Sequence, residues 1–158
     1  MLLRKCEYQQ NCLHGINRFL LLPSICLNRY RFNKLSMKLG FSIPLNVFGP
    51  GFSIAHYGTI IVNRCAKVGS NCRCQTGVCL GATNGSSIAP IIGNNVFLGE
   101  GCKIIGEVRI ADDVAIGANA VVVKDILEEG TTWGGVPAKK ISDNNSHSNL
   151  ATGLFITI

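Results

Sequence analysis

The stretch Ile92–Val122, IGNNVFLGEGCKIIGEVRIADDVAIGANAVV, decides the fold because an apolar residue returns in it at every sixth position. Counting by six extends the pattern back to Pro50, and nine of the thirteen positions hold Val, Leu or Ile. Repetition at a fixed period outranks local propensity, so residues 50–122 are predicted to form a solenoid with an unbroken register. The thirteen positions are Pro50, His56, Val62, Val68, Cys74, Leu80, Ser86, Ile92, Leu98, Ile104, Ile110, Ile116 and Val122.

The fifth position of each unit is often small or branched, as at Ala66, Cys72, Val78, Val96, Cys102, Val108, Val114 and Ala120. We expect each unit to form one short strand and a turn, with three units closing a triangular coil. First positions would then point inward and stack, and fifth positions would lie near corners that admit small side chains. Gly or Asn would supply the positive φ of the turns. The predicted fold class is an all-β core, a parallel β-helix of a little more than four coils.

Composition excludes several classes of protein. Apolar residues make up 47% and charged residues 15% of the chain, which argues against disorder, and 18 glycines argue against a helical bundle. The longest apolar run, Phe19–Leu27, is interrupted by Pro23 and is too short to span a membrane. With no recognisable secretory segment, the eight cysteines are expected to be reduced thiols of a cytoplasmic protein.

Positive charge is concentrated before the repeats. Residues 1–40 contain seven Lys or Arg against Glu7 alone, whereas residues 41–158 contain eight basic and eight acidic residues. No basic patch lies on the repeats, so a nucleic-acid partner is not expected. We expect residues 1–40 to form one or two short amphipathic helices, broken near Pro23, that cap the first coil. Their basic residues are interpreted as a solvated face, with contact to an anionic membrane surface as the lesser alternative.

The quoted stretch resembles the hexapeptide-repeat transferases. Within that group, residues 54–63 (IAHYGTIIVN) and 134–141 (GGVPAKKI) resemble the serine acetyltransferase-like branch. The resemblance covers roughly residues 41–141 and implies a left-handed β-helix, a homotrimer and acetyl-CoA as donor. It suggests three parts: a helical cap over 1–40, the β-helix domain over 41–141 and a C-terminal tail over 142–158. Asp143–Asn149 is interpreted as a polar linker, and Leu154–Ile158 as an edge strand or a loose tail.

His56 is the candidate catalytic residue. Acetyl transfer to a hydroxyl needs a base, and among three histidines only His56 falls within the repeats, at a position where the pattern favours an aliphatic residue. From the residues alone, a structural histidine is an equal alternative; the resemblance matches His56 to the family's catalytic histidine. It implies direct transfer from acetyl-CoA to the hydroxyl of a small acceptor. A covalent cysteine route has no activating partner in the sequence, and the Cys72-x-Cys74-x₄-Cys79 spacing does not predict a metal site.

The residues expected to bind coenzyme A rest on the resemblance. In similar transferases the pantetheine lies in a groove between coils of neighbouring subunits, against small residues. Gly99 and Ala118 match such positions. Lys124 and Lys139 match places where a basic side chain meets the phosphates of CoA. The alternative is that Ala118 is only a corner residue and that the lysines are solvated.

Departures from the family pattern concern the acceptor. Serine acetyltransferases carry an Asp before the catalytic His, an Arg-His pair in a later loop and an Asp that orients the catalytic His. Those places hold Ala55, Ile88 with Ala89, and Phe41 here. Because a zwitterionic amino acid needs charged partners, a sugar of a surface glycan is the expected acceptor. L-serine, as in cysteine biosynthesis, is the first alternative, and a non-catalytic β-helix scaffold is the second.

Overall fold

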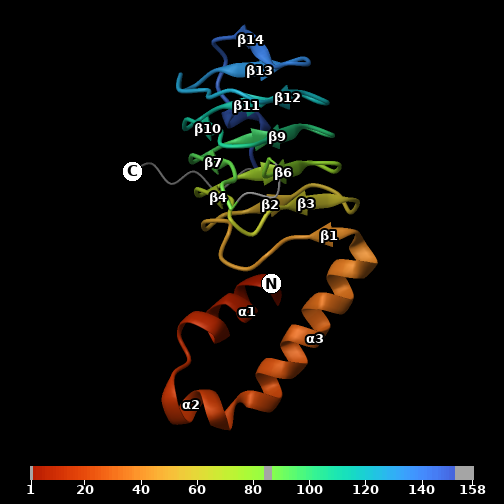
Figure 1. Cartoon of the computed structure of the whole chain (residues 1–158), viewed down its shortest axis with the longest axis vertical. Coiled ribbons are helices and arrows are strands. Elements are labelled where there is room, and N and C mark those ends of the chain that lie inside the picture. Colours follow the sequence, from red (N-terminus) through yellow and green to blue (C-terminus); the bar gives the residue numbers. More distant parts are fainter. Residues whose placement is uncertain (1, 84–86, 152–158) are drawn as a thin grey trace.

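The computed structural model describes residues 2–83 and 87–151. Figure 1 shows a stack of short strands with three helices at its N-terminal end. The strands form three sheets, each running along one side of the stack, and the pairs among the described residues are parallel except β13 with β14. The first sheet has the order β1 (Phe41–Ser42), β3 (Ile60–Val62), β6 (Cys79–Gly81), β9 (Lys103–Ile105), β12 (Val121–Val122). The second has the order β4 (Lys67–Val68), β7 (Ile91–Ile92), β10 (Arg109–Ile110). The third has the order β2 (Ser53–Ile54), β5 (Arg73–Cys74), β8 (Phe97–Leu98), β11 (Ala115–Ile116), β13 (Thr132–Gly134), β14 (Lys139–Ser142).

The core of the stack is the predicted one from Val62 onward. Consecutive strands visit the three sheets in turn, so each coil places one first-position residue on each side. Ten of the predicted first positions are buried, and the small fifth positions are buried beside them. The buried first positions are Val62, Val68, Cys74, Leu80, Ile92, Leu98, Ile104, Ile110, Ile116 and Val122.

The unbroken register is wrong at two places. Ile54 pairs with Cys74 and takes the inward place on β2, so His56 lies two residues beyond it, exposed in the loop to β3. Likewise Phe48, which bridges to Val68, is buried, whereas Pro50 is exposed. The second break lies between β6 and β7, where one step around the coil takes twelve residues instead of six. An insertion of six residues leaves a period-six count unchanged, which is why Ser86, outside the described residues, appeared to belong to the pattern.

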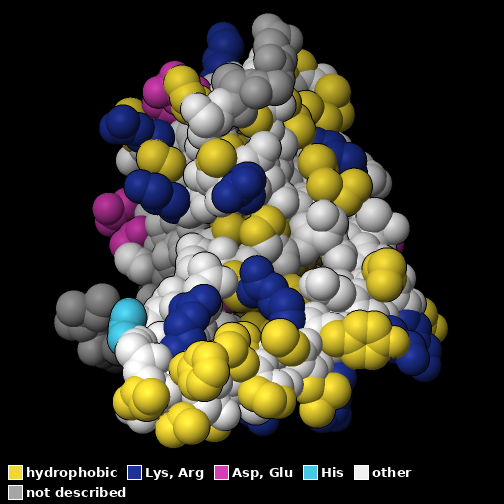
Figure 2. All heavy atoms as spheres, turned by 60° about the horizontal axis from the view of Figure 1, so that its bottom comes forward, with side chains coloured by type: hydrophobic (Ala, Val, Ile, Leu, Met, Phe, Trp, Pro, Cys, Tyr) yellow, Lys and Arg dark blue, Asp and Glu magenta, His cyan; other side chains and the backbone are white. Residues whose placement is uncertain are grey.

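Three helices, not one or two, precede the stack: α1 (Leu2–Asn11), α2 (Gly15–Leu20) and α3 (Leu22–Leu39). The predicted break near Pro23 falls at Leu21, between α2 and α3, and Pro23 itself lies in the first turn of α3, where its missing N–H leaves no helix bond unmade. Arg4 of α1 donates to the carbonyl oxygen of Phe48 at 2.8 Å, and the Glu7 carboxylate accepts from the Asn46 N–H at 2.8 Å. These bonds tie α1 to the first coil. Figure 2 shows apolar and basic side chains together at this end of the molecule.

No helix among the described residues is long and apolar enough to cross a membrane.

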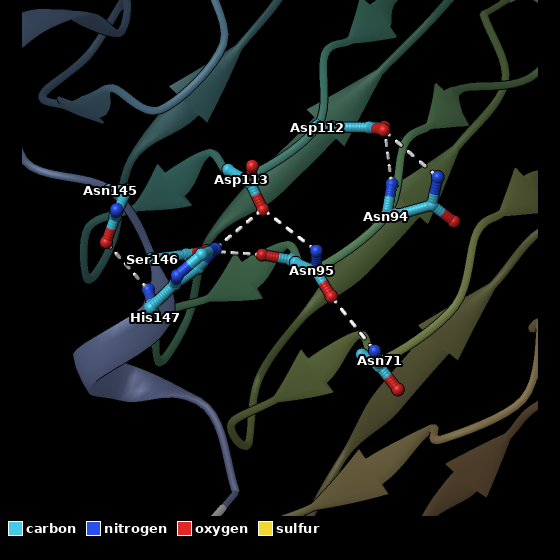
Figure 3. A network of polar contacts seen from close by, with 8 residues as sticks. All are labelled: Asn71, Asn94, Asn95, Asp112, Asp113, Asn145, Ser146 and His147. Atoms are coloured by element: carbon cyan, nitrogen blue, oxygen red, sulfur yellow. Dashed lines mark hydrogen bonds and ion pairs between the residues drawn. The ribbon is translucent and has the colours of Figure 1, made fainter. Parts of the chain in front are cut away.

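The segment after β14 docks on the stack, contrary to its interpretation as a linker. The Asn71 amide donates to Asn95 at 2.9 Å, and the Asn95 amide donates to Asp113 at 2.9 Å, which forms a polar ladder up one corner (Figure 3). His147 contacts the Asp113 carboxylate at 2.8 Å, and Ser146, fully buried, donates to the backbone oxygen of Asn95. Asn71, Asn95 and Asp113 all have positive φ. The predicted tail Leu154–Ile158 lies outside the described residues.

Candidate functional site

His56 lies in a loop that leaves the coil between β2 and β3. The Ala55 N–H donates to the carbonyl oxygen of Cys74 at 3.1 Å, which fixes the start of the loop on the stack. Gly58, at a φ of 143°, turns the chain back towards β3. His56 and Tyr57 are both exposed, and the His56 imidazole has no hydrogen-bond partner among the described residues. Its two ring nitrogens are therefore available to a ligand.

The loop belongs to one corner of the β-helix, where the chain passes from the third sheet to the first. We call this corner the His56 edge; it consists of residues 55–59, 75–78, 99–102 and 117–120. We include residues 135–138, which join β13 to β14 and lie next to the last of these, with the Val121 N–H donating to Gly135 at 3.0 Å. Backbone bonds hold its levels together: Gly77 donates to Thr59 at 2.7 Å, Gly101 to Thr76 at 2.8 Å, and Asn119 to Glu100 at 2.7 Å. Two of the residues predicted to bind CoA, Gly99 and Ala118, lie on this same edge.

Gly99 and Ala118 differ in what they offer a ligand. Gly99 is buried, and its N–H donates to the carbonyl oxygen of Ile116 at 2.8 Å. A Cβ at Gly99 would lie 2.6 Å from that same oxygen, so glycine is required here by close packing of two coils. Ala118 is exposed, and its N–H has no partner within the described part of the chain. Of the two, only Ala118 presents a free backbone donor on the His56 edge.

Lys124 and Lys139 line the same hollow, near the last coils. Its volume is about 270 Å³, and its floor is apolar. The adjacent Lys140 is engaged elsewhere: its ammonium pairs with Asp143 and Glu128, and hydrogen bonds to these carboxylates raise the pKa of Lys140. The hollow is lined by Val122, Val123, Lys124, Asp125, Ile126, Trp133, Pro137, Ala138 and Lys139.

Trp133 is a residue of this hollow that the sequence analysis did not single out. Its indole N–H donates to the Thr131 hydroxyl at 2.9 Å, which fixes the ring above β11. Lys103 was also missed: its ammonium donates to the carbonyl oxygens of Gly77 and Gly101, both at 2.7 Å, on the His56 edge. In the sequence, Trp133 is distinguished only as the single Trp and Lys103 only as a lysine within a repeat. Neither feature indicates on which side of the β-helix the side chain lies.

His56 and the hollow lie at different heights of the stack. In the third sheet, β2 and β13 are separated by β5, β8 and β11. Four spacings of parallel strands place the two levels about 19 Å apart. The arrangement suits a long ligand whose reacting group lies near His56 and whose charged end lies near Lys124 and Lys139.

The cysteines of the repeats are packing residues. Cys72, Cys74 and Cys102 are fully buried, with 3.9 Å between the Sγ atoms of Cys72 and Cys74. Burial raises the pKa of Cys102 to about 12, and a hydrogen bond with Cys72 together with burial raises the pKa of Cys74. Such thiols carry almost no thiolate near neutral pH and are poor nucleophiles. Within residues 2–83 and 87–151, no three His, Cys, Asp or Glu side chains are grouped to hold a metal ion.

At the positions where the family pattern has charged residues, this chain has apolar side chains. Phe41 packs against the core of the first coil, Ala89 is buried, and Ile88 is half exposed. Ala55 is half-buried at the base of the His56 loop.

Comparison with known proteins supports the predicted class. The family described as bacterial transferase hexapeptide (six repeats) matches residues 89–124. A serine acetyltransferase of Helicobacter pylori is 38% identical over 96 residues, which cover 60% of this chain and 56% of that protein. One of Synechococcus elongatus is 36% identical over 95 residues, 59% of this chain and 38% of that protein. The chain thus spans about half the length of these relatives, or less.

Two solved structures extend the likeness to the helices. Serine acetyltransferase of Brucella abortus in complex with coenzyme A matches 91% of this chain and 54% of its own, with a TM-score of 0.72 and 25% identity. The Neisseria gonorrhoeae enzyme in complex with serine matches 87% and 53%, with a TM-score of 0.65 and 29% identity.

The fold and the repeats define a hexapeptide-repeat protein of the left-handed parallel β-helix class. Within this class the chain is serine acetyltransferase-like. Both expectations drawn from the resemblance, the fold class and the branch, are confirmed.

Proposed function

We propose that this chain is an O-acetyltransferase that moves the acetyl group of acetyl-CoA to the hydroxyl of a small acceptor, with His56 as general base. The observation that carries the proposal is the exposed His56 imidazole, which has no hydrogen-bond partner in residues 2–83 and 87–151 and lies on the edge that also bears Ala118. The coenzyme A found with the Brucella abortus relative supports acetyl-CoA as the donor.

The proposed chemistry needs one base and no covalent enzyme intermediate. His56 takes the proton of the acceptor hydroxyl while its oxygen attacks the thioester carbonyl carbon. The tetrahedral intermediate collapses, the carbon–sulfur bond breaks, and the CoA thiolate takes the proton back from the imidazolium. The neutral imidazole is thereby restored, and the products are the acetyl ester and CoA thiol.

We infer that CoA lies along the His56 edge, with its thioester near His56 and its phosphates near Lys124 and Lys139. The Ala118 N–H, which has no partner among the residues that the structure describes, lies between the two ends and suits the amide oxygens of the pantetheine arm. Gly99 contributes by letting the coils approach, not by donating its N–H, which is already bonded to Ile116. A neighbouring copy in a homotrimer would close the other side of this groove, as the resemblance implies.

We infer L-serine as the acceptor, in place of the sugar expected from the missing charged residues. The relatives named above are serine acetyltransferases, and the Neisseria gonorrhoeae relative is in complex with serine. The neutral residues at Ala55, Ile88 and Ala89 remain the specific observation in favour of an uncharged acceptor. Both acceptors use the same base and donor, so they differ only in what recognises the rest of the molecule.

The experiment is acetyl transfer measured by mass spectrometry, with L-serine and a panel of hexoses and amino sugars as acceptors. His56→Ala should lower the rate by roughly 10² to 10⁴-fold, the usual contribution of a general base. His14→Ala is the matched control, because His14 is also exposed and precedes α2 at the opposite end of the molecule; its rate should equal that of the native chain.

Each outcome separates a different part of the proposal. Transfer to a sugar and not to L-serine would overturn the acceptor and leave the reaction class. Equal rates for His56→Ala and the native chain would overturn the role of His56. Binding of acetyl-CoA with no transfer to any acceptor would favour the scaffold alternative.

A further inference from the structure

The helical end of the molecule leaves large apolar side chains in solvent. No residue of α2 is buried, and the exposed fractions are 69% for Ile16 and Phe19, 68% for Leu20, 43% for Leu21 and 41% for Leu22. We call these five residues the apolar tip. Contiguous apolar surface of this kind marks an interaction site more often than chance.

The apolar tip is organised as one face. Ile16, Phe19 and Leu20 are spaced i, i+3 and i+4, so they share one side of α2, and Leu21 and Leu22 continue the surface into the start of α3. Figure 1 shows α2 at the end opposite β14, lying across the long axis of the molecule. The tip can therefore meet a flat surface while the β-helix stands clear of it.

Charge around the tip has one sign. Residues 11–40 contain five basic residues, Arg18, Arg29, Arg31, Lys34 and Lys38, and no Asp or Glu. All five are exposed, and Figure 2 shows Lys and Arg side chains next to apolar ones at this end. Arg18 lies within the tip's own helix, and Arg29 follows Leu22 by seven residues, about 10 Å along α3. Arg18 is two residues from Ile16 and so lies on the other side of α2, and the distance to Arg29 exceeds the screening length of about 8 Å at physiological salt. The basic residues therefore act through the net charge of this end of the molecule.

This charge decides between two occupants. A second copy of the chain would bring the same basic surface against itself, with no acidic side chain in residues 11–40 to pair with it. The one acid of the helical part, Glu7, is buried and already paired with Arg4 at 2.7 Å. The occupant that complements the surface is apolar and anionic at once.

We propose that the apolar tip docks this protein onto an anionic lipid bilayer. The tip's apolar side chains enter the region between headgroups and acyl chains, and the net positive charge of residues 11–40 attracts the anionic headgroups. The contact is interfacial, because none of the described helices can span a bilayer. It does not depend on the acetyltransferase proposal, since neither His56 nor the hollow takes part.

The test is co-sedimentation of the full chain with vesicles of phosphatidylcholine alone and of an equal mixture of phosphatidylcholine and phosphatidylglycerol. We expect binding to the mixed vesicles only, weakened by added salt. The double variant Phe19→Ser, Leu20→Ser should bind at least about tenfold more weakly, and Arg18→Gln roughly fivefold more weakly.

Matched controls exist on the β-helix, away from the apolar tip. Leu127 is 71% exposed and Lys67 is exposed, so Leu127→Ser and Lys67→Gln test the same chemical changes away from the tip and should leave vesicle binding unchanged. Failure of the native chain to bind mixed vesicles would overturn the proposal. So would equal binding by the double variant, or sedimentation velocity showing that the tip pairs two copies without lipid.

Discussion

Replacing Gly99 by alanine should destabilise the fold through contact between two coils. A Cβ at Gly99 would lie 2.6 Å from the carbonyl oxygen of Ile116 and 2.8 Å from the backbone of both Gly117 and Ala118. All three atoms belong to the coil above. That coil is held in place by the Gly99–Ile116 hydrogen bond at 2.8 Å and by the bond from Gly117 to Trp133 at 2.7 Å. The new methyl group can be accepted only if the coils separate.

The expected loss is about 2 kcal/mol of the free energy of unfolding. Overpacking costs about 1–3 kcal/mol, and straining the Gly99–Ile116 hydrogen bond costs about 1 kcal/mol more. Alanine also lowers the conformational entropy of the unfolded chain, which stabilises the folded state by about 0.4–1 kcal/mol. For a chain of this size the melting temperature should fall by about 4–8 °C, measured by circular dichroism at fixed protein concentration.

Gly117→Ala is the matched control. A Cβ there would meet one atom tightly, the Trp133 carbonyl oxygen at 3.3 Å, with the next at 3.8 Å, so its melting temperature should change little. If Gly99→Ala were as stable as Gly117→Ala, the close approach of the coils would not be what requires glycine at position 99.

Three further predictions concern the buried cysteines and the polar ladder. In native protein at pH 8, the buried Cys6, Cys72, Cys74 and Cys102 should react with a thiol reagent at least about a hundredfold more slowly than the exposed Cys12 and Cys26, and equal rates by mass spectrometry would contradict their burial. Because the pKa of Cys102 is raised from 9.0 to about 12, this thiol ionises first in the unfolded chain. Its contribution to stability should therefore be constant below pH 9 and be lost as the pH rises towards 12 in denaturant titrations. Asn95→Ala should lose about 2–3 kcal/mol, since it breaks two hydrogen bonds and keeps a φ of 54°. Asn95→Gly, which relieves only the backbone strain, should lose about 1 kcal/mol less, and identical losses would show that φ is not part of the cost.

The core could be predicted from the sequence because successive coils have the same structure and therefore require the same kinds of residue at the same positions. Each coil presents the same environment to its first and fifth positions, so Leu98 and Ile116 occupy equivalent places and the period alone identifies them as buried. The two breaks were not predictable by counting, because a loop of six added residues preserves the count and the loop at 55–59 falls where the pattern begins.

The docked C-terminal segment was missed for a different reason. Ser146 is polar, lies in a polar stretch and has no periodic neighbour, so nothing local distinguishes it from a linker residue. It is buried because of Asn95, fifty-one residues away, whose backbone oxygen it contacts. The ladder of Asn71, Asn95 and Asp113 is visible in the sequence only as turn residues, and a turn residue does not indicate what its side chain will hold.

His56 was predicted to be catalytic partly because the period-six count placed it at an inward-facing first position. The structure places it in an exposed loop instead, and this exposure favours a catalytic role. A residue in a true first position points into the core, where a substrate cannot reach it, as Cys74 and Leu98 illustrate. His56 is accessible because the chain departs from the repeat after Ile54, which fills the inward place. The departure is short enough for β3 to rejoin the first sheet, with Thr59 bonded to Gly77. The β-helix thus supplies a rigid edge with regularly spaced backbone groups, and one loop that breaks the repeat supplies the only histidine on it.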